Sequence, residues 1–229
     1  MKKQQGFTLI EIAIVLVIIG LLLGGVLKGQ ELITSARVRN IISQQDGVKA
    51  AFFGFLDRYR AYPGDYGQAT ATIPGCTACQ DGNNDGQITN NATVGAATVD
   101  EQIAVWEHLS HAGFINGSYT YAADTETTSS APANPYGRFL QLIYDTKYAN
   151  AGTSARHNLK TGNQIPSDLL AEVDRKIDDG RGDAGSFRFS AYGGQTSAAD
   201  ITTAATCYTA GANWISATPE PNCGAASLF

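Results

Sequence analysis

The feature that most constrains this chain is an apolar run of 21 residues near its N-terminus, FTLIEIAIVLVIIGLLLGGVL, in which Glu11 is the only charged residue. As an α-helix the run spans roughly 32 Å, enough to cross a hydrocarbon core of about 30 Å. Lys2 and Lys3 precede the run and favour a cytoplasmic N-terminus. We therefore expect residues beyond the run to lie on the far side of a membrane.

The apolar run continues into an amphipathic segment without a helix breaker. Val38, Ile41, Phe52 and Phe55 are among the apolar residues that recur there at spacings of three and four. No proline interrupts residues 7–62, and Pro63-Gly64 provides a stop. The sequence predicts one helix of roughly 80 Å, with an apolar half at 7–28, an amphipathic half at 29–62 and a globular head at 63–229.

Glu11 decides between three interpretations of the N-terminus. A secretory signal would be cleaved after the apolar run, near Gly24-Gly25, and would leave Glu11 unexplained. A plain membrane anchor would require Glu11 to reach the interface or take up a proton, because a carboxylate deep in a bilayer costs about 2.5–3.5 kcal/mol. In the third interpretation, Glu11 is retained because it has a charged partner.

The third interpretation is carried by a resemblance. Residues 6–11, GFTLIE, after a short basic leader, resemble the cleavage and methylation motif of type IV pilins and type II secretion pseudopilins. The resemblance implies that residues 1–6 are a leader, that a prepilin peptidase cuts after Gly6, and that the new amino group of Phe7 is methylated. It also implies that Glu11 pairs with the N-terminal amine of a neighbouring subunit during assembly.

The same resemblance implies a structural role and no enzymatic activity. The expected function is that of a subunit of an extracellular type IV pilus-like filament, or fimbrium, polymerised with copies of itself. The alternative is a pseudopilin, major or minor, in a periplasmic pseudopilus that drives protein export. Either protein would start in the inner membrane and depend on a platform protein and an assembly ATPase.

The head is predicted to be α+β and pilin-like, with the long helix packed against a small antiparallel sheet. Helices are expected at 100–115, starting near Asp100, and at 166–179, capped by Ser167. Clusters of aromatic and β-branched residues predict strands at 119–122, 139–144 and 187–191. Turn formers occupy much of the remainder.

A segment of the head resembles a calcium-binding loop. Asp81, Asn83 and Asp85 alternate along DGNNDGQI, and the carbonyl of Gln87 would be the next ligand. Ala92 stands where such loops place a bidentate glutamate, so a remote acid such as Asp100 or Glu101 would have to complete the site. The competing interpretation is a surface turn rich in Asn, Asp and Gly. No cofactor is required by the predicted function, and calcium would be structural.

The four cysteines form two local pairs, predicted to be the disulfides Cys76-Cys79 and Cys207-Cys223 outside the cytoplasm. The first pair has the spacing of a redox motif but does not start a helix after a strand. Zinc is disfavoured because no second close pair follows. The second pair encloses 15 residues, worth about 3 kcal/mol in the chain-entropy model.

Composition argues against several other functions. The net charge is -5 and no basic run is longer than Lys2-Lys3, so nucleic acid is not an expected partner. No nucleophile elbow or phosphate-binding loop is present in the sequence. A calcium-dependent adhesin on a membrane anchor is the alternative from another class, and it would not need cleavage at Gly6.

Overall fold

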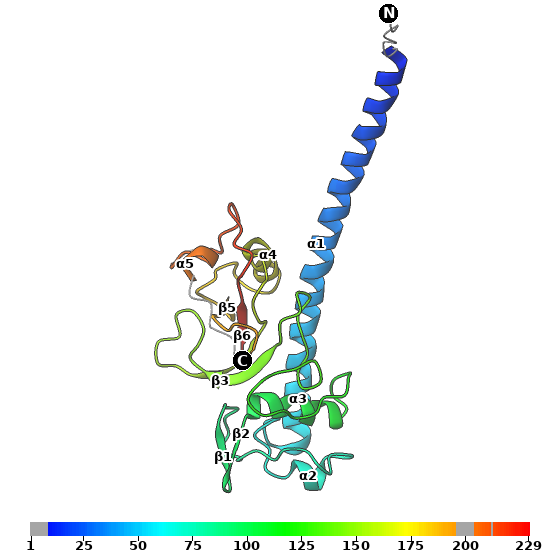
Figure 1. Cartoon of the computed structure of the whole chain (residues 1–229). Coiled ribbons are helices and arrows are strands. Elements are labelled where there is room, and N and C mark those ends of the chain that lie inside the picture. Colours follow the sequence, from blue (N-terminus) through cyan, green and yellow to red (C-terminus); the bar gives the residue numbers. More distant parts are fainter. Residues whose placement is uncertain (1–8, 196–203, 212) are drawn as a thin grey trace, which may run out of the picture. The chain divides into compact units, whose positions relative to one another are not determined.

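The computed structural model describes residues 9–195, 204–211 and 213–229. The chain divides into two compact units, Met1–Arg37 and Val38–Phe229. Helix α1 (Leu9–Tyr59) is 51 residues long and contributes its first part to one unit and its second part to the other (Figure 1). The predicted helix therefore exists, but it ends at Tyr59, three residues before the predicted end.

The second unit contains a four-stranded antiparallel sheet. Its strands are β3 (Gln141–Asp145), β4 (Arg156–Lys160), β6 (Ala225–Leu228) and β5 (Phe187–Phe189), in that spatial order. The register places Gln141 opposite Lys160, and Lys160 opposite Ala226. The last strand of the sequence thus lies inside the sheet, between β4 and β5 (Figure 1).

The other elements of this unit are short. Strands β1 (Ala92–Val94) and β2 (Ala97–Val99) form a separate antiparallel hairpin. Helices α3 (Glu101–His111) and α4 (Ser167–Ile177) have 11 residues each. Helices α2 (Ala69–Thr72) and α5 (Ala204–Cys207) are single turns.

The amphipathic part of α1 is the spine of the head. Phe52 and Phe55 lie in one buried cluster with Trp106 of α3. Val38 and Ile41, earlier on the helix, lie in a second buried cluster with residues of α4 and of β5. Because one helix face serves two apolar clusters, α1 and the sheet form a single packed unit, and the α+β, pilin-like fold class is confirmed.

Two local predictions were wrong. Ser167 begins α4 but does not cap it: its hydroxyl donates to the carbonyl of Ile215 at 2.5 Å and accepts the Glu220 N–H at 3.0 Å, so it holds the C-terminal loop. Residues 119–122 form no strand. The Tyr121 N–H donates to a Glu107 carboxylate oxygen at 3.1 Å, so a side chain takes the place of a neighbouring strand.

Two disulfides, Cys76-Cys79 and Cys207-Cys223, are present in the head. The first closes a turn between α2 and the segment that was predicted to bind calcium. The second connects α5 to the segment immediately before β6, across a sequence separation of 16. The C-terminal disulfide therefore anchors the inner strand of the sheet.

Candidate functional site

The first unit exposes an uninterrupted apolar surface. Between Leu9 and Leu27 all fourteen large apolar side chains are exposed, from 45% for Ile19 to 88% for Leu9. The most apolar 18-residue window of α1 has a mean hydropathy of 2.8 and none of it is buried within the chain. Covering these side chains with lipid or other helices would be worth roughly 20–40 kcal/mol. This surface is built to contact something outside the chain.

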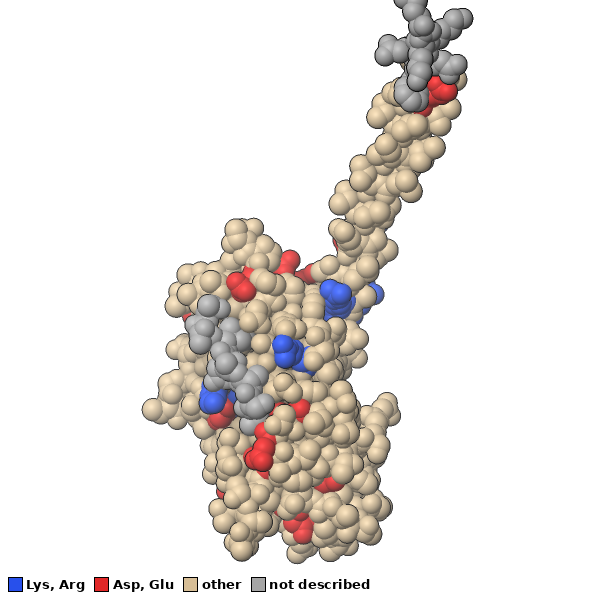
Figure 2. Space-filling model, in the orientation of Figure 1, with Lys and Arg blue, Asp and Glu red and all other residues tan. Residues whose placement is uncertain are grey.

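Glu11 lies in the first turn of α1 and is the only charged residue between Leu9 and Leu27. Its acidic group favours the positive end of the helix dipole. The next charged residues are Lys28 and Glu31, which form an exposed ion pair at 2.7 Å, and the intervening helix surface carries no charge (Figure 2). Gly6 and Phe7, the predicted processing residues, lie outside the described residues.

The residues predicted to bind calcium are distributed over two arrangements. Asn83 and Asp85 lie together: the Asp85 N–H donates to Asn83 Oδ1 at 3.0 Å, and the Asn83 amide donates to Asp85 Oδ2 at 3.0 Å. Asp81 instead accepts the backbone N–H and the hydroxyl of Thr70, both at 2.9 Å. The N–H of Gln87 donates to Asp85. The calcium site at this loop stays a prediction.

Two buried acids from other segments hold this loop in place. Asp65 accepts the N–H groups of Asp85 and Gly86, at 2.9 and 3.0 Å. Glu101, at the start of α3, accepts those of Asn83 and Thr89 at 3.0 and 3.1 Å. Burial raises the pKa of Asp65 and raises the pKa of Glu101 to about 7, despite these N–H donors.

The sequence predicted the alternating oxygen pattern but not the role of Asp65. Asp65 follows the Pro63-Gly64 helix stop, and its position next to a chain reversal is the only signal that it would face the loop. Glu101 was named as an acid that could complete a cation shell. In the structure its two oxygens are occupied by backbone donors of the loop, which is a structural role.

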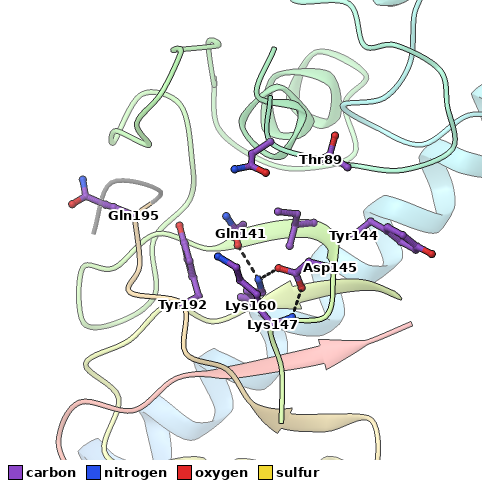
Figure 3. Close-up of a pocket in the computed structure, with 10 residues that line it drawn as sticks. Thr89, Gln141, Tyr144, Asp145, Lys147, Lys160, Tyr192 and Gln195 are labelled. Carbon is purple, nitrogen blue, oxygen red and sulfur yellow. Dashed lines mark hydrogen bonds and ion pairs between the residues drawn. The ribbon is translucent and has the colours of Figure 1, made fainter. Parts of the chain in front are cut away.

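A small cavity of about 150 Å³ opens beside β3 and β4 and was not predicted (Figure 3). Lys160 is fully buried at its edge. Its ammonium group forms an ion pair with Asp145, donates to Gln141 Oε1 at 3.2 Å, and lies 5.8 Å from the centre of the Tyr192 ring. A buried lysine is rare unless it is paired, so this cluster specifies the pairing of β3 with β4.

His108 and His111 of α3 have different surroundings. His108 is buried: Nδ1 accepts the Gly64 N–H at 2.9 Å and Nε2 lies 2.7 Å from the Gln80 carbonyl. Burial lowers the pKa of His108 to about 4, so the ring is neutral and structural. His111 lies close to the Cys76-Cys79 disulfide. The sulfurs are joined, so this group is a disulfide with a neighbouring imidazole.

The geometry now defines a class of protein. A long apolar helix with one early acid, an amphipathic continuation and an α+β head with disulfides describe a pilin-like architecture. The comparisons agree: residues 1–27 match the family described as the prokaryotic N-terminal methylation motif, which is the signature of type IV pilins and pseudopilins. The comparisons with curated proteins and with solved structures found no match. The chain is a type IV pilin-like or pseudopilin protein.

Proposed function

We propose that this chain is a structural subunit of an extracellular type IV pilus-like filament. The observation that carries the proposal is the exposed apolar surface of α1 with Glu11 as its only charge, at the position that the methylation motif assigns to assembly. Processing after Gly6 would give Phe7 a free amine, which is then methylated. The subunit would reside in the inner membrane before it enters the filament.

The physical basis of assembly is the transfer of one apolar surface from lipid to protein. Lipid and a bundle of helices are both apolar, so the hydrophobic effect changes little, and a specific polar contact has to favour the filament. Pairing of Glu11 with the Phe7 amine of a neighbouring copy would supply that contact and offset the burial of both charges. The chain contains no nucleotide-binding motif, so a separate ATPase and a platform protein would drive the cycle.

The proposal is tested by replacing Glu11. Cells making the parent chain, Glu11→Ala or Glu31→Ala are sheared, and the released material is examined by negative-stain microscopy and intact-mass spectrometry. Glu31 is the matched control because it is an exposed glutamate on the same helix, outside the apolar run. We expect filaments whose subunits begin at N-methylated Phe7 in the parent and in Glu31→Ala, and their loss in Glu11→Ala.

Other outcomes would change the conclusion. Processed subunits that stay with the cell and form no filaments in the parent would indicate the pseudopilin role in protein export. A full-length mass that retains residues 1–6 would contradict both roles and leave a membrane-anchored protein. Equal filament yields from all three chains would show that Glu11 does not direct assembly.

A further inference from the structure

Three carboxylates gather where α4 ends, away from the loop that the sequence suggested for calcium. Asp174 lies in the last turn of the helix, and Asp178 and Asp179 follow its end. One oxygen from each of the three lies within 4.8 Å of the others. Two ligands on opposite sides of a calcium ion at about 2.4 Å are separated by about 4.8 Å, so the spacing fits one ion.

The electrostatics of this cluster are unfavourable without a cation. The C-terminal end of a helix carries the negative end of the helix dipole and carbonyl groups without helical partners. Of the nearby basic side chains, Lys176 pairs with Glu172 at 2.6 Å and Arg181 with Asp183 at 3.2 Å. Lys49 of α1 attracts Asp178 but is shared with Asp46. The three acids therefore exceed the local positive charge.

Asp174 provides the second, independent observation. It is fully buried, and its Oδ2 accepts the indole N–H of Trp214 at 2.7 Å. Its Oδ1 is buried and has no hydrogen-bond partner among the described residues. Burial raises the pKa of Asp174 to about 6, although the Gly180 N–H and the Trp214 indole both oppose that rise. A buried carboxylate oxygen without a partner costs about 1–3 kcal/mol.

The other two acids are held in position by the loop that enters β5. Asp178 accepts the N–H groups of Ser186 and of Phe187, the latter at 3.0 Å. Gly185 approaches the Asp178 carboxylate so closely that a Cβ at this position would overlap it. Asp179 is exposed and accepts the Arg181 N–H at 2.9 Å. The site is thus a rigid pair of acids with an accessible third.

We propose that Asp174, Asp178 and Asp179 bind a calcium ion, which holds the end of α4, the loop before β5 and the Trp214 segment together. Oxygen ligands from carboxylates favour a hard divalent cation, and the irregular arrangement favours calcium over magnesium, which requires near-octahedral geometry. The contrast with the 81–87 loop is physical: most of its carboxylate oxygens already accept backbone N–H groups, whereas Asp174 Oδ1 has no partner.

Trp214 makes the proposal directly testable, because its indole contacts a proposed ligand and can transfer excitation energy to a bound terbium ion. The full chain in detergent is titrated with Tb³⁺ and then with Ca²⁺. We expect tryptophan-sensitised terbium emission that calcium displaces, and an apparent affinity at least tenfold weaker in Asp179→Asn. Asp179 is the residue to replace because it is exposed and supports the least structure. Asp85→Asn, in the 81–87 loop, is the matched control and should leave the affinity unchanged.

Trp214→Phe separates binding from its optical signal. This variant should lose the emission but keep the calcium-dependent rise in melting temperature, which Asp179→Asn should lose. Emission that survives in Trp214→Phe would place the ion elsewhere, and emission lost in Asp85→Asn but kept in Asp179→Asn would place it at the 81–87 loop. Either result, or no displacement by calcium, would overturn the assignment.

Discussion

Replacement of Lys160 by methionine should destabilise the head by about 3–5 kcal/mol, because it leaves the Asp145 carboxylate without its charged partner in a largely buried site. Methionine keeps most of the aliphatic stem, so little packing is lost. Asp145 would retain two neutral donors, the Lys147 N–H at 3.1 Å and the Asn158 amide at 3.0 Å. Gln141 and the Tyr192 ring would lose their contacts with the ammonium group as well.

The effect is measured by urea unfolding and by thermal melting of the full chain in detergent. For a domain of this size the loss corresponds to a fall in melting temperature of roughly 6–20 °C. Asp145→Asn and the double variant complete a thermodynamic cycle. We expect the double variant to be more stable than Lys160→Met alone, with a coupling energy of about 2 kcal/mol or more.

A loss below about 1 kcal/mol in Lys160→Met would show that the ion pair behaves as a solvent-screened surface pair. A coupling energy near zero would show that Lys160 acts through its other contacts. Either result would refute the conclusion that this pair specifies the pairing of β3 with β4.

Three further predictions concern the head. Removal of the C-terminal disulfide by Cys207→Ser with Cys223→Ser should cost about 3 kcal/mol, against about 2 kcal/mol for Cys76→Ser with Cys79→Ser, because the closed loop is longer; equal urea midpoints would contradict this. Gly64→Ala should cost at least 2 kcal/mol, since φ is +88° and the new Cβ would lie 2.5 Å from the Glu101 carbonyl oxygen; Gly113→Ala, with φ +78° and open space, is the control and should cost about 1 kcal/mol. Burial lowers the pKa of His157 to about 4, so the unfolded chain binds the proton first and stability is lost as pH falls from 6.5 towards 4. His157→Phe should therefore gain on the order of 1–2 kcal/mol relative to the parent at pH 5, after allowance for solvent screening, but little at pH 7.5; a difference independent of pH would contradict the assignment.

The long helix and both head helices could be predicted from the sequence because their signals are local. Apolar spacing placed α1, and the start and stop residues placed α3 and α4 within a few residues of their ends. The central strands could not be predicted in this way. Strand β4 reads RHNLK and contains a buried lysine whose partner lies on another strand, and β6 reads AASL, which is short and has no β-branched residue. Their pairing is a property of the assembled head.

The candidate sites show the same division. The motif at residues 6–11 is contiguous, so the sequence was sufficient to identify it. The 81–87 loop was predicted from its own residues, but Asp65 and Glu101, which hold it, come from other elements. The acids at the end of α4 did carry a local signal: Asp174 and Asp178 are one helical turn apart, with Asp179 adjacent. That signal becomes informative only when Trp214 and the unpartnered Asp174 oxygen are seen.

The position of β6 has a consequence for biogenesis. Because β6 lies between β4 and β5, neither half of the sheet is complete until residues 225–228 have been translocated. The head of a membrane-inserted precursor would therefore stay open while its earlier segments emerge, and would close in one late step together with oxidation of Cys223. Export factors and the oxidising machinery would meet an incompletely folded head, and a shortened or tagged C-terminus would be expected to impair secretion before it affects any property of a finished filament.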